Sequence, residues 1–290
     1  MKIKVLSSKN YKNNDKNCGD CIMIDTGLKA IVYDCGCEEH AKEVVKYLQE
    51  HNYDKADVIL SHNDADHFDG LNYLIDQNKV SSITTILLLK HIDDILDELD
   101  DKRRTRESIK KQISDYFDNI YSLSGNNLND SLDDDFTLDP CLNFAGPSYD
   151  YLLEAVAKAL DNSESDNIDM ETIVNAISVQ VEIIVDNHKV LLTGDASYAA
   201  IEDKIREYDA IQLPHHGKYE QAKQIFKKND GREDVIYIVS DNTGNSNGGS
   251  DELMKNEIGR KIKNTKICEI NIDNNSFVNV RTGYYAIWDI

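Results

Sequence analysis

The chain has 290 residues, 40% of them hydrophobic, and a formal net charge of −21 at pH 7. This apolar content suffices for one large core, and we expect a single sandwich-like domain with an insertion. The acidic charge argues against a protein that grips extended nucleic acid, because such proteins present a basic face to the phosphates. No apolar run is long enough to cross a membrane and no signal peptide precedes the first predicted strand, so we expect a cytoplasmic protein without a membrane partner.

Hydrophobic alternation predicts a β-rich first half. The predicted strands are 3–6, 20–26, 29–34, 57–61 and 83–89. Helical spacing of apolar residues predicts a helix over 39–51 and another that begins near Phe68. A helical insertion is expected over 91–170, with helices that include 92–99, 109–120 and 148–160.

The second half again combines strands with helices. Its predicted strands are 178–185, 189–193, 210–213, 235–239, 267–272 and 277–287. Its predicted helices lie near 197–207, 219–227 and 251–263. Two β-rich halves around a helical segment indicate an α/β fold.

Four side chains that ligate metal ions occur within six residues, directly after the apolar stretch 58–60. They are His62, Asp64, Asp66 and His67. Imidazole and carboxylate bind Zn²⁺, Mn²⁺ or Fe²⁺, and a chain that leaves a strand can direct alternate side chains toward two ions. Asp66 and His67 open the next helix, which turns them toward a second position. The alternative is that the two acids form a solvated, helix-capping loop.

Two later motifs offer the same ligand chemistry at strand ends. Asp195 follows a short apolar strand and Gly194, and glycine lets the backbone turn so that the carboxylate projects. Such a carboxylate can bridge two cations. His215 and His216 follow the strand 210–213 and Pro214. Three strand-end motifs of one chemistry favour a metal site over isolated surface features.

The pattern His-x-Asp-x-Asp-His at 62–67, followed by Phe-Asp-Gly, resembles the signature of the metallo-β-lactamase-fold hydrolases. The aspartate in place of the second histidine is similar to the hydrolase domain attached to the competence DNA-uptake channel. Further segments resemble the family's remaining motifs in the same order: 18–24, 31–36, 175–178, 190–195 and 213–217.

The resemblance implies one α/β domain over 1–290, a four-layer αβ/βα sandwich of metallo-β-lactamase type. It implies two divalent ions, Zn²⁺ or Mn²⁺ with Mg²⁺ as a further option. The implied metal-binding residues are His62 and Asp64 for the first ion, Asp66, His67 and His215 for the second, and Asp195 as the bridge.

The resemblance also implies roles around the ions. Asp66 would orient the nucleophilic water, and His216 would be an alternative ligand or a group that protonates the leaving group. Asp20 and Asp34 would accept hydrogen bonds behind the ligands.

The chain departs from the family pattern in two places. A further histidine ligand is expected before Asp195, and only His91 and His188 lie in that interval. The first site is therefore carboxylate-rich, which favours Mn²⁺ or Mg²⁺. No histidine follows His216, although competence-type relatives have one near the glycine-rich segment at 241–249. A structural zinc site formed by Cys18, Cys21, Cys35 and Cys37 is a further alternative.

These features predict a metal-dependent hydrolase that uses a hydroxide shared by two ions. Phosphodiester hydrolysis is the leading reaction, by a phosphodiesterase or a nuclease that acts on short or single-stranded ends. One alternative is hydrolysis of a lactone, ester or thioester, and another is a weakly active or non-catalytic module that binds a protein partner. The insertion could form a wall of the site, where its basic residues 102–106 meet a phosphate or balance nearby acids.

Overall fold

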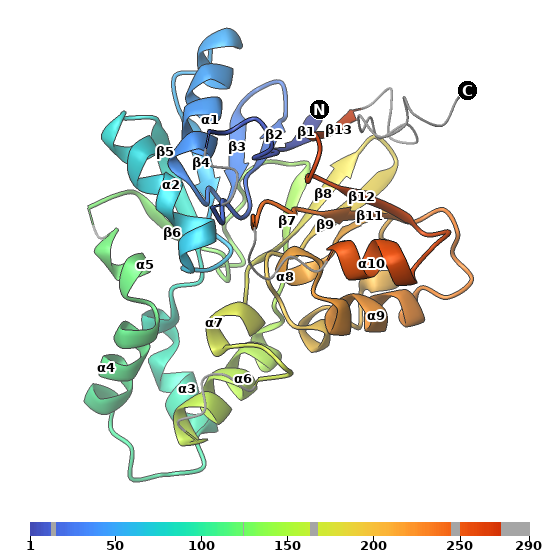
Figure 1. Cartoon of the computed structure of the whole chain (residues 1–290). Helices are drawn as coiled ribbons and strands as arrows, with labels where there is room; N and C mark the ends of the chain where they lie inside the picture. Colours follow the sequence, from blue (N-terminus) through green and yellow to red (C-terminus); the bar gives the residue numbers. More distant parts are fainter. Residues whose placement is uncertain (13–15, 124, 163–167, 245–249, 274–290) are drawn as a thin grey trace, which may run out of the picture.

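The strands of the computed structural model form two sheets that pack face to face (Figure 1). The structure describes residues 1–290 except 13–15, 124, 163–167, 245–249 and 274–290. The first sheet has the strand order β13-β1-β2-β3-β4-β5-β6, and the second has the order β12-β11-β10-β9-β8-β7. The strands of the first sheet are β1 (Lys2–Val5), β2 (Ile22–Asp25), β3 (Ala30–Tyr33), β4 (Ala56–Ile59), β5 (Val80–Thr85), β6 (Leu128–Asp130) and β13 (Ile270–Asp273). Those of the second are β7 (Leu142–Gly146), β8 (Gln180–Val185), β9 (His188–Leu192), β10 (Ala210–Gln212), β11 (Ile236–Val239) and β12 (Lys261–Asn264).

Each sheet contains a parallel half and an antiparallel half. Strands β3 to β6 run parallel to one another, as do β9 to β12. In a parallel set, the carboxyl ends of all strands lie at one edge of the sheet. The loops that follow β4, β9 and β10 carry the predicted ligands, so this edge of the sandwich is where they can meet.

The central strands of the second sheet are buried on both faces. Val190 and Leu192 pack in the core that the two sheets share, whereas Leu191 belongs to a second core with Phe226 and Leu253 of the helices. This alternation follows from the two-residue period of a strand. It also explains why these strands are apolar runs, as is typical of parallel strands covered on both faces.

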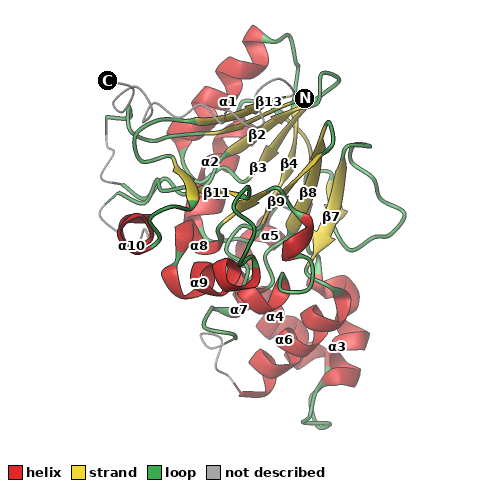
Figure 2. Cartoon of the chain, turned by 90° about the vertical axis from the view of Figure 1, so that its right-hand side faces the viewer, coloured by secondary structure: helices red, strands yellow, loops and turns green. Residues whose placement is uncertain are grey.

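Helices cover the outer faces of the two sheets. Helices α1 and α2 lie beside the first sheet and α8, α9 and α10 beside the second (Figures 1 and 2). The resulting order of helix, sheet, sheet, helix confirms the predicted α/β sandwich. The α-helices are α1 (Glu38–Glu50), α2 (Ala65–Asp76), α3 (Ile92–Glu98), α4 (Arg106–Tyr116), α5 (Asp118–Ser122), α6 (Tyr149–Asn162), α7 (Ile173–Ala176), α8 (Pro214–Gly217), α9 (Tyr219–Lys228) and α10 (Ser250–Asn256).

Four predicted elements are wrong in extent or type. The predicted helix 109–120 is divided into α4 and α5, because Phe117 leaves helical geometry with φ −121°. The predicted helix 197–207 is two short 3₁₀ turns, because Ile201 leaves helical geometry with φ −126°. The predicted helix 251–263 ends at Asn256, and Gly259, with φ 101°, lies outside helical geometry in the turn before β12. The predicted strand 83–89 ends at Thr85, and a 3₁₀ turn follows over Leu88–His91. The predicted strand 277–287 lies outside the described residues.

The segment expected as a helical insertion also contains two strands. Helices α3 to α6 are present, but β6 joins the first sheet and β7 joins the second as edge strands. The helical part reaches the loop after β4, where Asn63 donates to the carbonyl oxygen of Tyr116 and accepts from Asn119, both at 3.1 Å. Across the described residues, no helix combines the length and apolar character needed to span a membrane.

Candidate metal centre

The loop between β4 and α2, together with the first turn of α2, carries the first four candidate ligands. Asp64 is the N-cap residue of α2, yet its side chain makes no capping hydrogen bond. Its carboxylate instead lies with Oδ2 3.7 Å from Nε2 of His62. Asp66 and His67 lie in the first turn of α2. The alternative that Asp64 serves to cap the helix is therefore wrong.

His62, His67 and Asp195 form a buried cluster where the ends of β4 and β9 meet. Nε2 of His67 lies 3.3 Å from Oδ1 of Asp195, and Nε2 of His62 lies 3.9 Å from Oδ2 of Asp195. None of His62 Nε2, His67 Nε2 and Asp195 Oδ1 has a hydrogen-bond partner within the described part of the chain. Unpaired polar atoms are costly inside a protein. This set of nitrogen and oxygen donors fits a divalent cation.

A second cluster adjoins the first and shares His67 with it. Its members are Asp20, His67 and His216. The buried His216 has Nε2 3.0 Å from Oδ2 of Asp66 and Nδ1 3.2 Å from Oδ1 of Asp20. Asn17 donates to the same oxygen of Asp66 at 2.8 Å. The structure thus brings His216, not His215, beside Asp66.

The two neighbouring histidines point in different directions. Both have left-handed backbone conformations, with φ 51° at His215 and 52° at His216. This conformation costs roughly 1–2 kcal/mol for a residue with a side chain, and such strain is concentrated at functional sites. As a result the ring planes are 81° apart. Nε2 of His215 lies 3.9 Å from Oδ2 of Asp195.

Buried carboxylates contact the Nδ1 atoms of two of the imidazoles and fix the orientation of these rings. Asp34 accepts hydrogen bonds from the backbone N–H and the hydroxyl of Ser61, both at 2.7 Å, and lies 2.8 Å from Nδ1 of His67. Glu171 lies 2.8 Å from Nδ1 of His215. These contacts leave each Nε2 directed at Asp195, which is how outer carboxylates orient metal-binding histidines.

The electrostatics of the site couple imidazoles to carboxylates. Burial lowers the pKa of His67 and of His216, but nearby carboxylates, above all Asp195, outweigh it and raise both pKa values well above the ordinary range. Burial raises the pKa of Asp195, yet the two imidazoles hold it well below its usual value. The pKa of Asp66 is lowered against burial by its hydrogen bond with His216. The cluster therefore holds protons that a cation would displace.

Several residues at the site had no role in the sequence prediction. Glu171 is fixed by Lys218 and Gln221, both at 2.9 Å. Ser178 places its hydroxyl 3.2 Å from Nδ1 of His62. Gln212 and Asn17 contact Asp20 and Asp66 respectively. Only Ser178 belonged to a recognised motif, so the sequence offered no signal for the others.

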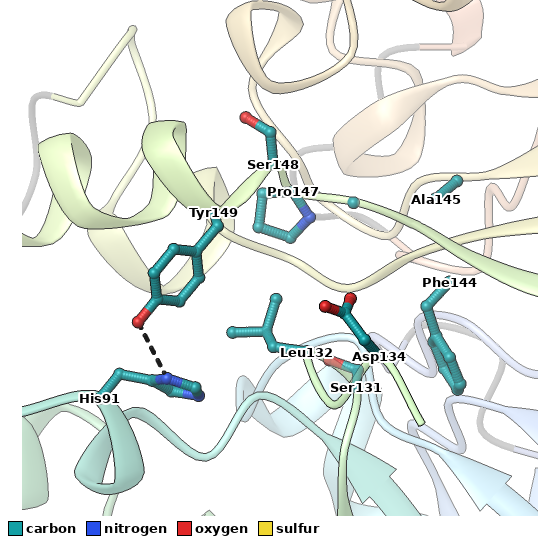
Figure 3. A pocket seen from close by; sticks show the side chains of 10 residues that line it. His91, Ser131, Leu132, Asp134, Phe144, Ala145, Pro147, Ser148 and Tyr149 are labelled. Carbon is teal, nitrogen blue, oxygen red and sulfur yellow. Dashed lines mark hydrogen bonds between the residues drawn. The ribbon is translucent and has the colours of Figure 1, made fainter. Parts of the chain in front are cut away.

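His91 lies outside both clusters. Its Nε2 is 3.0 Å from Oδ2 of Asp130. Its Nδ1 is 3.1 Å from the hydroxyl of Tyr149 (Figure 3). It lines a cavity of about 500 Å³ between β6, β7 and the start of α6. His188 lies 3.4 Å from Asp209. Neither histidine supplies the further ligand.

The four cysteines of the alternative zinc site are buried free thiols. Each cluster of three metal-binding side chains found in the described residues consists of histidine and aspartate alone. The structure gives the cysteine site no support.

Comparisons with known proteins agree with this architecture. The family model described as the metallo-beta-lactamase superfamily matches residues 17–141. The chain is similar to the solved structure of Tm1679, described as a metal-dependent hydrolase of the beta-lactamase superfamily, with 14% identity, a TM-score of 0.53, and coverage of 94% of this chain and 98% of that one. It is similar to the metallo-beta-lactamase fold protein YhfI from Bacillus subtilis, with 12% identity, a TM-score of 0.50, and coverage of 91% and 96%.

No curated protein matches the chain by sequence. The resemblance to the competence-type group stays a prediction. The chain has the metallo-β-lactamase fold, and the family model matches less than half of its length.

Proposed function

We propose that the protein is a metal-dependent hydrolase with two divalent ions, and that a phosphodiester is its substrate. The observation that carries the proposal is the convergence of His62 Nε2, His67 Nε2 and Asp195 Oδ1, three buried atoms without hydrogen-bond partners in the described residues. Divalent ions bound there would make hydroxide available at neutral pH and polarise the scissile bond. Tm1679, which shares the fold, is described as a metal-dependent hydrolase.

The residues around the clusters have separate tasks in this proposal. Asp34 and Glu171 fix the rings of His67 and His215. Asp66 is held between Asn17 and His216, so its carboxylate is placed to orient a water molecule. His215 is a quarter exposed, whereas the side chain of His216 is almost fully buried. We therefore assign the contact with substrate to His215 and the positioning of Asp66 to His216.

The charge of the chain limits the substrate. The protein has a net charge of −21, so its binding to long DNA or RNA would gain little free energy from counterion release. The substrate we propose is therefore a small phosphodiester or a short single-stranded end. The phosphate would be bound by the ions, which compensate for the acidic surroundings. A protein partner remains compatible with this activity.

The test combines metal content with turnover. We expect about two ions per chain by elemental analysis, and hydrolysis of bis-p-nitrophenyl phosphate or of short single-stranded DNA with Mn²⁺, Mg²⁺ or Zn²⁺. Loss of a contact behind a metal ligand lowers metal affinity by roughly 10–100-fold. Asp195→Ala should lower it further, because in this proposal both ions share the carboxylate of Asp195. Asp203 is exposed, so Asp203→Ala is the control that makes the same change in charge at the surface.

The outcomes separate the alternatives. Turnover of lactones, esters or thioesters without turnover of phosphodiesters would replace the substrate and keep the metal chemistry. A protein that binds two ions and hydrolyses none of these compounds would be a binding module. Normal metal content in Asp195→Ala would contradict the proposed centre itself.

A further inference from the structure

The side chain of Gln212 joins two parts of the candidate centre that lie on different sheets. Gln212 ends β10 and is buried. Its Oε1 accepts hydrogen bonds from the backbone N–H groups of Thr193 at 3.0 Å and Gly194 at 3.3 Å. These two residues form the turn that presents Asp195. One amide oxygen therefore fixes the position of the predicted bridging carboxylate.

The nitrogen of the same amide contacts the second cluster of the site. Nε2 of Gln212 donates to Oδ2 of Asp20. Oδ1 of Asp20 lies 3.2 Å from Nδ1 of His216, although the hydrogen bond of that nitrogen is with the carbonyl oxygen of Ser240 at 3.0 Å. Nε2 of His216 lies 3.0 Å from Oδ2 of Asp66. A continuous chain of polar contacts thus runs from the Asp195 turn through Gln212, Asp20 and His216 to Asp66.

Only a side chain with both a donor and an acceptor satisfies both ends. A glutamate at this position would keep the acceptor for the turn but would place a second carboxylate against Asp20. A leucine would leave two backbone N–H groups and one carboxylate oxygen unpaired in a buried region. The requirement for an amide follows from the contacts and not from space alone.

We infer that Gln212 is a positioning residue that sets the spacing between Asp195 and the His216–Asp66 pair, and so couples the two ion positions. The inference rests on the proposed function, since it assigns Gln212 a role toward metal ions. Gln212 itself touches neither cluster's unpaired atoms and acts through Asp20 and the Thr193–Gly194 backbone.

The test exchanges the amide and the carboxylate. Gln212→Glu and Asp20→Asn are made separately and together, and Mn²⁺ or Zn²⁺ binding is measured by calorimetry alongside kcat and KM. We expect Gln212→Glu to lose about 10–100-fold in metal affinity, as for other contacts behind metal ligands. Asp20→Asn should lose at least as much, because Asp20 is itself a member of the second cluster. In the double variant, the introduced amide donates to the introduced carboxylate, so the hydrogen bond between the two positions and the net charge are conserved. We expect its metal affinity to be higher than that of either single variant.

Controls keep the outcomes distinct. Gln49→Glu, on the exposed side of α1, makes the same change in charge away from the site. The double variant keeps the test decisive where a single variant unfolds, because it restores the contacts. A Gln212→Glu variant that binds metal like wild type, or a double variant that binds metal no better than the weaker single variant, would overturn the role of Gln212. Wild-type protein that binds no metal would instead overturn the proposed function, which separates the two failures.

Discussion

Two glycines on neighbouring loops enclose the main chain at Asp66. A Cβ atom on Gly36 would stand 2.0 Å from the carbonyl oxygen of Asp66, and one on Gly19 would stand 1.7 Å from it. Gly19 also has φ 52°, which residues with side chains rarely adopt. Both contacts are with backbone, which cannot swing aside as a flexible side chain can. The position of this candidate ligand therefore depends on the absence of side chains at 19 and 36.

Gly36→Ala tests this dependence without a φ penalty. We expect the free energy of unfolding to fall by about 1–3 kcal/mol, because the added methyl group overpacks a close backbone contact. Metal affinity should fall as well, since Asp66 must shift. Urea denaturation in the presence of a chelator and a calorimetric metal titration measure the two effects. Gly125→Ala is the control, because its added Cβ meets no atom within 4 Å. Equal behaviour of the two variants would show that the contact is dispensable.

The sequence revealed those site residues whose ligand chemistry is concentrated in short motifs. His62, Asp66 and Asp195 each follow a strand in a recognisable pattern. It could not decide between His215 and His216, because their directions depend on two successive left-handed residues. Glu171 was missed for a different reason. It is 44 positions from His215, and only tertiary packing brings it to Nδ1.

Among the helices and strands, the buried strands were easier to predict from the sequence than the edge strands. The central strands are apolar on both faces and were found from their sequences, as β9 to β11 illustrate. The edge strand β6 has three residues, and β7 reads Leu-Asn-Phe-Ala-Gly, so neither has a clear alternation. Edge strands that are short and partly polar leave a weak signal.

The contact of α4 and α5 with the metal loop leads to a prediction about the role of these helices. Asn119 of α5 donates to the carbonyl oxygen of the buried Asn63, directly between His62 and Asp64. Asn119→Ala removes this donor, and we expect a loss of about 0.5–1.5 kcal/mol in the free energy of unfolding. A several-fold loss of metal affinity should accompany it, because the loop that carries His62 and Asp64 loses a support. Thermal unfolding and metal titration test both effects.

The control for this prediction is Asn127→Ala, which removes an exposed asparagine side chain just before β6. It should leave metal affinity unchanged. If Asn119→Ala lowers stability but leaves metal binding intact, the helices support the fold without supporting the site. The predicted role of the insertion as a wall of the site would then be limited to contact with substrate.

For the molecule as a whole, the buried imidazoles and carboxylates link stability to pH. His67 and His216 have raised pKa values, so their contribution to stability is complete below about pH 6.5 and is lost as the pH rises through the folded-state values. Asp195 and Asp66 have lowered pKa values, so their contribution is present above about pH 4 and is lost as the pH falls. The metal-free protein should therefore be most stable between these limits.

Above pH 6.5, metal affinity should rise with pH, whereas the stability of the metal-free protein should fall. A cation needs neutral imidazole, so each proton that must leave lowers the apparent affinity by up to about tenfold per pH unit below the folded-state pKa. We expect stability of the chelator-treated protein to decline from pH 6 to pH 8 while metal affinity rises over the same range. Urea denaturation and calorimetry in buffers of different ionisation enthalpy measure the two trends and the protons released. Asp195→Asn removes the leading cause of both raised pKa values, so its stability should vary less with pH. A metal-free wild type that gains stability toward pH 8 would contradict the charge pairing on which this expectation rests.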